Sequence, residues 1–341
     1  MFGGQARVPI VVRQPTGLWM NCAAQHSQSL EAWWAHMPGL VVLAPATPAD
    51  SYAMIKAAIR ADDPVILLEH KELWGVAGEV EQAFARAGRF VLSNAKNHRM
   101  DPDVPLVIPE VNAPHLGLLD RQREQRAWTG GIVTNANCAA TVAAVAMAPL
   151  HEAFGIDRAM VFTMQAVSGA GYPGVPSLDI LGNVIPYISE EEAKVERELD
   201  KMLGRFDGRA IAPAGVAVSA HTNRVPAEHG HMVCLSLGFR RRVTPDEALA
   251  AMDAWRGHPE ALGLPSSPDR ALVVTREPDR PQTRRDVGAG SGMTVTAGRV
   301  RPDPLFDLRL VALGHNTIRG AAGGSILNAE LLARHGLLPA A

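Results

Sequence analysis

Cysteine is rare in this chain, which holds only Cys22, Cys138 and Cys234 among its 341 residues. Three scattered thiols cannot build a disulfide framework, and none stands in the close spacing of a zinc site. We therefore expect no bound metal. A lone cysteine is usually a buried, inert residue, so a chemical role for any of the three must be argued from its neighbours.

An excess of charge of either sign is also missing. The formal net charge is −2, which excludes a protein that binds nucleic acid by electrostatic attraction. The longest apolar run, around residues 138–150, is too short to cross a bilayer, and the first residues lack the basic-then-apolar pattern of a signal peptide. We expect a cytoplasmic protein with a small-molecule substrate, no nucleic acid and no membrane.

A dinucleotide-binding motif is missing at the start of the chain. Strands and helices are predicted to alternate over the first 75 residues, at 8–12, 29–36, 39–44, 47–60 and 64–68. This βαβαβ pattern predicts a parallel sheet. The residues after the first strand read Arg-Gln-Pro-Thr-Gly, and no Gly-x-Gly-x-x-Gly follows. The turn that cradles a diphosphate is therefore not expected there.

The surroundings of Cys138 favour a catalytic thiol. A strand predicted at 131–134 leads through an Asn-rich turn into an Ala-rich helix that begins with Cys138. A helix N-terminus offers unpaired N–H groups and partial positive charge, so we expect a lowered pKa for this thiol. The neighbouring Asn137 can direct its side-chain amide at an oxyanion. This arrangement predicts nucleophilic catalysis.

The segment 224–231 offers a cation and a base for such a nucleophile. Arg224 and His231 stand seven residues apart, and the ordinary histidine pKa of about 6.5 suits a base for a thiol. Spacing alone does not rank His221, His229 and His231 as candidates for that base.

The rest of the chain predicts an α+β layout. A predicted helix at 190–203 puts Glu191 and Lys194 on one face, a pattern equally typical of a solvated charged helix. A long loop or hairpin arm is expected at 278–293. The other predicted elements are strands at 90–93, 106–108, 159–166 and 232–242 and helices at 116–128 and 245–255.

Several motifs in one order carry a family resemblance over the chain from about residue 77 onward. They lie at 93–107, 134–138, 164–174, 223–226 with 230–231, and 320–325 with 327–330. These motifs resemble aspartate-semialdehyde dehydrogenase of the branch found in archaea and fungi. The resemblance implies NADP- and phosphate-dependent interconversion of L-aspartate 4-semialdehyde and 4-aspartyl phosphate through a cysteine thioester, in a homodimer or homotetramer.

The same resemblance implies roles for particular residues. Those at the reacting centre are Cys138 as nucleophile, His231 as acid/base, Gln165 orienting the substrate, Arg224 pairing with its carboxylate, Glu191 meeting its ammonium group, and Arg99 and Lys194 holding phosphate. Those resembling the part of the NADP site nearest the nicotinamide are Ser168, Gly169, Gly171 and Asn328.

The first 75 residues resemble a different family. Runs at 8–13, 24–33, 45–50 and 63–71, including Gln25-His26-Ser27-Gln28, resemble the β subunit of the thiamin-diphosphate-dependent 2-oxoacid dehydrogenases, of the pyruvate and acetoin type. The likeness covers the middle of that subunit, without the glutamate that activates thiamin diphosphate, so this cofactor is not expected. We interpret His26 as a structural residue.

The sequence thus predicts an α/β plus α+β fold. An incomplete Rossmann-like parallel sheet, whose N-terminal part is a foreign βαβαβ segment, precedes a semialdehyde-dehydrogenase catalytic and dimerisation domain; the expected divisions are 1–76, 77–155 with 320–341, and 156–319. Three functions stay open. They are an aspartate-semialdehyde dehydrogenase impaired by loss of its dinucleotide-binding start, a non-catalytic chimeric protein that pairs with intact dehydrogenase subunits, and an E1 β fragment.

Overall fold

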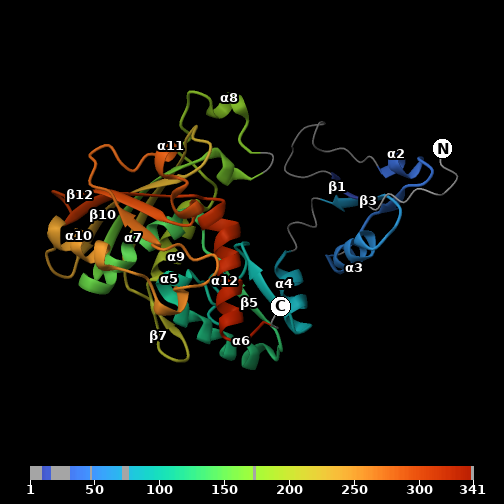
Figure 1. The fold of residues 1–341 in the computed structure, drawn as a ribbon, viewed down its shortest axis with the longest axis horizontal. Helices are drawn as coiled ribbons and strands as arrows, with labels where there is room; N and C mark the ends of the chain where they lie inside the picture. Colours follow the sequence, from blue (N-terminus) through green and yellow to red (C-terminus); the bar gives the residue numbers. More distant parts are fainter. Residues whose placement is uncertain (1–9, 17–30, 47, 71–76, 172–173, 339–341) are drawn as a thin grey trace. The chain divides into compact units, whose positions relative to one another are not determined.

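The chain divides into two compact units, Met1–Phe84 and Ala85–Ala341, which are drawn in Figure 1. The computed structural model describes residues 10–16, 31–46, 48–70, 77–171 and 174–338. The expectations for His26, and for the starts of the first predicted strand and helix, lie outside the described residues.

The N-terminal unit contains the predicted parallel sheet. Its elements are β1 (Val11–Thr16), α2 (Glu31–Ala35), β2 (Val41–Leu43), α3 (Pro48–Ile59) and β3 (Val65–His70). β3 lies between β1 and β2 and runs parallel to both. The apolar residues of β3 from Val65 to Leu68 are all buried, as expected for a strand with a neighbour on each side and both faces covered.

A second parallel pair of strands opens the C-terminal unit. The elements in this part are α4 (Ala77–Arg86, across the boundary of the units), β4 (Phe90–Ser93), α5 (Pro109–Asn112), η2 (Ala113–Gly117), α6 (Leu118–Arg126), β5 (Gly131–Thr134) and α7 (Cys138–Phe154). β4 pairs in parallel with β5.

The strand predicted at 106–108 is wrong. Only an isolated bridge joins Leu106 to Thr134. The side chain of Asn112 accepts the N–H of Ile108 and donates to the carbonyl of Leu106, so backbone groups that could extend a strand ladder are already bonded.

A six-stranded mixed sheet, in the order β11-β12-β13-β10-β6-β9, dominates the C-terminal unit. Its strands are β6 (Ile156–Gln165), β9 (Ala217–Arg224), β10 (His231–Phe239), β11 (Leu272–Val274), β12 (Val295–Pro302) and β13 (Leu308–Gly314). The remaining elements are η3 (Val167–Ala170), α8 (Ser177–Ile180), α9 (Glu191–Met202), β7 (Arg205–Phe206), β8 (Ile211–Ala212), α10 (Pro245–Ala254), η4 (Pro259–Ala261), α11 (Thr283–Asp286), η5 (Ala289–Gly292), the π-helix η6 (Ile318–Ala322) and α12 (Gly323–Arg334).

The long loop expected at 278–293 contains the short helices α11 and η5. Asp286 organises this segment, because its carboxylate accepts hydrogen bonds from the guanidinium of Arg280 and from the N–H of Gln282. Charge-assisted contacts of this kind can order a short segment that has no apolar periodicity to reveal it in the sequence.

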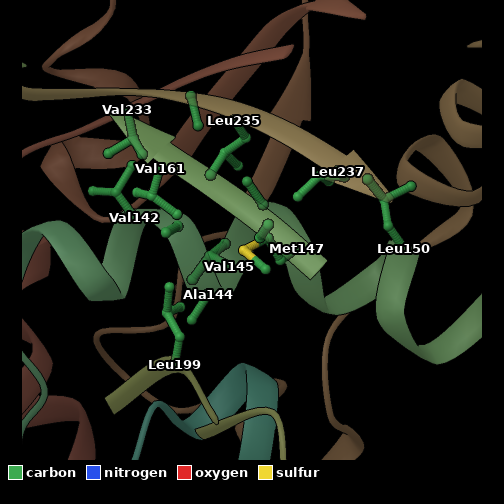
Figure 2. Packing of buried hydrophobic residues seen from close by; sticks show 14 of the residues in the cluster. Val142, Ala144, Val145, Met147, Leu150, Val161, Leu199, Val233, Leu235 and Leu237 are labelled. Atoms are coloured by element: carbon green, nitrogen blue, oxygen red, sulfur yellow. The ribbon is translucent and has the colours of Figure 1, made fainter. Parts of the chain in front are cut away.

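The core forms where α7 packs on the mixed sheet. Residues 139–150 of α7 are all buried, as expected for a helix that is apolar on every side. Val142 and Met147 of α7 face Val161 of β6 and Val233 and Leu235 of β10, as Figure 2 shows. This packing fixes the helix whose first residue is Cys138.

The C-terminal helix returns to the region of β4 and β5. Leu327 and Leu331 of α12 share a buried cluster with Val107 and with Val133 of β5. Among the described helices, none has the length and apolar character needed to cross a membrane.

Candidate active site

Cys138 begins α7 in an environment that disfavours the thiolate. Asn137 caps the helix, because its Oδ1 accepts the N–H groups of Ala139 and Ala140 at 2.9 and 3.0 Å. These bonds engage two of the donors expected to stabilise a thiolate, although the N–H of Ala139 still lowers the pKa of the thiol. Burial, followed by the negative charge of Glu191, raises the pKa of Cys138 to about 12, so the predicted lowering of this pKa is wrong.

The π-helix η6 approaches Cys138 closely. A Cβ atom added to Gly320 would lie 2.5 Å from the Cβ of Cys138, so this approach requires glycine. Cys138 as a whole residue is half-buried. Sequence reasoning assigned Gly320 only to a family motif and missed its contact with the nucleophile.

Glu191 is the centre of a cluster of predicted site residues. Its side chain is 6% exposed, and its Oε1 accepts hydrogen bonds from Nδ2 of Asn137 at 2.7 Å and Nε2 of Gln165 at 3.2 Å. Its Oε2 lies 3.5 Å from Nζ of Lys194. The structure therefore gathers Asn137, Gln165, Glu191 and Lys194 beside Cys138, and the Asn137 amide, predicted to face an oxyanion, donates to Glu191.

Arg224, the last residue of β9, is a buried cation. Its side chain is 6% exposed, and its Nη1 donates to the carbonyl of Ala166 at 2.8 Å. Arg224 forms no ion pair with any carboxylate in the part of the chain that the structure describes. Burial lowers the pKa of Arg224, and a buried unpaired charge is costly. The site therefore favours an incoming anion.

His231, the first residue of β10, is buried and neutral. Its Nδ1 accepts the N–H of Ala166 at 3.1 Å, which assigns the proton of the neutral ring to Nε2. Burial lowers the pKa of His231 to about 3, well below the ordinary value expected from the sequence. Nε2 has no partner among the described residues, so it can donate a hydrogen bond to a ligand.

The other histidine candidates lie in different surroundings. The ring of His221 stacks on Phe162 at 4.7 Å, and both side chains are exposed. The ring of His229 stacks on that of His315 at 5.1 Å. Of the three histidines, His231 is the best candidate for the acid/base, because it lies beside Arg224. Gly169 is packed against both side chains, and a Cβ atom added to Gly169 would lie within 3.0 Å of each.

Arg99 and Lys194 line one cavity of about 500 Å³, together with Lys96, Arg197 and Glu190. Arg99 is 8% exposed, and its Nη2 donates to the carbonyl of Asn94 at 2.6 Å. Cations outnumber acidic side chains around this cavity, which suits an oxyanion.

Glu198 is a buried residue that sequence reasoning missed. Its Oε1 accepts from Nη1 of Arg99 at 2.9 Å, and its Oε2 accepts the backbone N–H of Asn137 at 2.6 Å. Burial raises the pKa of Glu198, and the charge of Arg99 opposes this effect. The available signal was spacing, because Glu198 stands seven residues after Glu191 and so on the same face of α9.

The predicted cofactor residues lie in two places. Ser168 and Gly169 belong to η3, which lies against His231 because Gly169 has no side chain. Gly171 ends this turn with φ +70 and has open space around it. Asn328 lies instead in the core, where its Nδ2 donates to the carbonyl of Val107, and its buried Oδ1 has no partner among the residues that the structure describes.

The open end of the η3 turn leaves room for a ligand, because no described atom lies within 4 Å of a Cβ atom added to Gly171. Within the described ranges, no group of three or more metal-ligating side chains comes together.

Comparisons with known proteins match two families. The model "Semialdehyde dehydrogenase, dimerisation domain" matches residues 147–319, and "Semialdehyde dehydrogenase, NAD binding domain" matches residues 74–118. The model "Transketolase, pyrimidine binding domain" matches residues 1–76.

Individual relatives agree with the first family. Aspartate-semialdehyde dehydrogenase of Archaeoglobus fulgidus is 51% identical over 263 residues, 77% of this chain and 75% of the relative. That of Methanothermobacter thermautotrophicus is 48% identical over 259 residues, 75% and 74% of the two chains. The Candida albicans enzyme, solved with NADP, superposes with a TM-score of 0.70 at 38% identity, over 82% of this chain and 80% of that one. The chain therefore belongs to the aspartate-semialdehyde dehydrogenase family and carries a segment matching the transketolase pyrimidine-binding domain at its N-terminus.

Proposed function

We propose that this protein catalyses the phosphate-dependent oxidation of L-aspartate 4-semialdehyde, and the reverse reaction, through a thioester on Cys138. The observation that carries the proposal is that two buried charges of opposite sign, Arg224 and Glu191, both lie close enough to Cys138 to act on its thiol, and that Arg224 has no ion-pair partner among the described residues. An α-amino acid brings a carboxylate for Arg224 and an ammonium group for Glu191. Held at both ionic ends, it presents its side-chain aldehyde to Cys138.

Substrate binding also activates the thiol in this scheme. The charge of Glu191 raises the pKa of Cys138, and a substrate ammonium group beside Glu191 offsets that charge. The sulfur adds to the aldehyde carbon while the thiol proton passes to the aldehyde oxygen, giving a hemithioacetal, and the Nε2–H of His231 donates a hydrogen bond to that oxygen. Gln165, fixed by Glu191, orients the substrate.

Phosphate completes the turnover. NADP, when bound, would supply the hydride acceptor that this oxidation needs, and the adduct would become a thioester as its carbon loses a hydride and its hydroxyl loses a proton. A phosphate oxygen held by Arg99 and Lys194 then attacks the thioester carbon, the C–S bond breaks, and aspartyl phosphate leaves while Cys138 returns as thiolate. Ser168, Gly169 and Gly171 would hold the nicotinamide end of the cofactor.

We infer that the protein binds NADP weakly. The residues after β1 contain no Gly-rich turn, and the region matches a transketolase pyrimidine-binding domain instead. Each lost charge-assisted contact to the diphosphate costs roughly 1.5–3 kcal/mol, so a thousandfold loss of affinity, about 4 kcal/mol, is expected. We also propose the division into 77–155 with 320–341 and 156–319, and self-association through the latter.

The test is NADPH formation by purified protein supplied with aspartate semialdehyde, NADP and phosphate, with Cys138→Ala as control. Turnover that disappears in the control supports the proposal. Absence of turnover at saturating NADP, together with co-purification with intact dehydrogenase subunits, would favour the non-catalytic interaction protein. Binding of thiamin diphosphate with magnesium would favour the E1 β fragment.

A further inference from the structure

One face of α9 carries charges of alternating sign at Glu191, Lys194, Glu198 and Lys201. These residues follow one another at spacings of three and four, so they form a single row along the helix. The first two belong to the site already described. The last two contact Arg99 and the loop that carries it, which the proposed reaction does not explain.

Lys201 holds the main chain of that loop. Its Nζ donates to the carbonyl oxygens of Arg99 at 2.7 Å, Asp101 at 2.9 Å and Val104 at 2.8 Å. An ammonium group has three protons, so each one has an acceptor. Burial lowers the pKa of Lys201 to about 8, and the group is still mostly protonated at neutral pH.

The same helix also holds the side chain of Arg99. Glu198, one turn before Lys201, accepts from Nη1 of Arg99. Both the backbone and the guanidinium of Arg99 are therefore tied to α9, the helix that carries Lys194. Two of the cations that line the 500 Å³ cavity, Arg99 and Lys194, thus have a separation set by one rigid element.

We propose that Lys201 is a positioning residue that preassembles the oxyanion site formed by Arg99 and Lys194. The inference rests on the proposed role of those two cations in holding phosphate. Without the ammonium group, the carbonyl of Arg99 loses its anchor, and phosphate must order the loop as it binds. Affinity for phosphate then falls although neither cation has been altered.

Arg126 offers a matched control. From α6 it pairs with the side chains of Asp101 and Asp103 in the same loop, but it does not bind the carbonyl of Arg99. Arg126→Met removes one positive charge and one set of loop contacts, as Lys201→Met does. A general loosening of the loop, or a general loss of charge, would affect both variants alike.

The experiment is calorimetric titration of the full-length protein with inorganic phosphate, below the unfolding temperature of each variant. Lys201→Met is expected to weaken phosphate binding roughly tenfold or more, the equivalent of one lost charge-assisted contact, while Arg126→Met changes it by less than about threefold. Lys201→Gln, which keeps two hydrogen-bond donors, should have a phosphate affinity between those of the unaltered protein and Lys201→Met. It replaces Lys201→Met in the test if that variant does not fold.

Equal losses in Lys201→Met and Arg126→Met, or unchanged affinity in a folded Lys201 variant, would overturn the inference. Absence of phosphate binding by the unaltered protein would overturn it as well. Because the titration needs neither semialdehyde nor NADP, its result is separate from the turnover assay that tests the proposed function.

Discussion

The Arg224→Met variant tests whether Arg224 binds the substrate or only stabilises the fold. In the free protein Arg224 is 6% exposed, bonded to the carbonyl of Ala166 and unpaired with any described carboxylate. Methionine keeps the unbranched chain and removes the charge. The variant therefore loses one hydrogen bond, about 1 kcal/mol, and is relieved of a buried unpaired charge that costs several kcal/mol.

Because the lost charge destabilises the free protein but binds the substrate, stability and activity should change in opposite directions. The free energy of unfolding should stay equal or rise by about 1–3 kcal/mol. A substrate carboxylate bound through two charge-assisted hydrogen bonds contributes roughly 3–6 kcal/mol, so kcat/KM should fall by roughly 10² to 10⁴. The exposed Arg242 supplies a control, because Arg242→Met should change neither quantity appreciably.

The assay compares aspartate semialdehyde with 3-aminopropanal, which lacks the carboxylate. The Arg224→Met variant and the unaltered protein should use 3-aminopropanal with similar kcat/KM, because neither can form the ion pair. The reasoning is refuted if Arg224→Met unfolds more easily by more than about 2 kcal/mol, or if its kcat/KM for the full substrate falls less than tenfold.

Four further predictions follow from the site. In the unfolded chain His231 takes up a proton below its ordinary pKa of 6.5, whereas in the native protein it does so only near pH 3. The free energy of unfolding should therefore fall by roughly 2–5 kcal/mol as the pH drops from 6.5 toward 3. Urea titrations should show a weaker dependence on pH in His231→Gln. Because the pKa of the Cys138 thiol is about 12, the rate at which iodoacetamide alkylates Cys138 should keep rising about tenfold per pH unit above pH 9. A rate that levels off near pH 8.5 in the ligand-free protein would contradict this high pKa. Glu191→Gln should lower kcat/KM for aspartate semialdehyde by roughly 10². For succinic semialdehyde, which has no ammonium group, kcat/KM should stay equal or rise, because the charge that adds to the effect of burial on the thiol pKa is gone. Fluorescence titration should give an NADPH Kd roughly a thousandfold above that of an intact relative, and ordinary affinity would disprove the inferred loss.

Periodicity predicted the first sheet and several elements of the C-terminal unit, but of the six strands of the mixed sheet it predicted only β6 and β10. The strands at 90–93 and 131–134 have the predicted bounds, and the helix predicted at 190–203 differs from α9 by one residue at each end. Two of the other expectations fail where side chains bond to the backbone. The side chain of Asn112 bonds to backbone N–H and C=O groups of the strand expected at 106–108. The carboxylate of Asp286 accepts a backbone N–H within the loop expected at 278–293 and so stabilises its folded form.

The site was only partly open to sequence reasoning. Motifs identified the residues that gather around Cys138, but their protonation depends on burial and on neighbours far away in the chain. Asn137 consumes the helix-start N–H groups, and Glu191, 53 residues after Cys138, adds a negative charge. No motif marks Glu198 or Lys201, and a row of charges on a helix usually indicates a solvated face. Their contacts were therefore not predicted.

The most direct test of the account is to trap the acyl-enzyme. The protein is mixed with 4-aspartyl phosphate, made in place by an aspartate kinase, in the absence of any dinucleotide, and its peptides are mapped by mass spectrometry. We expect an aspartyl group on Cys138 that Cys138→Ala lacks and Arg224→Met largely loses. An unmodified Cys138 in the folded protein would contradict the proposed thioester chemistry, whatever the affinity for NADP.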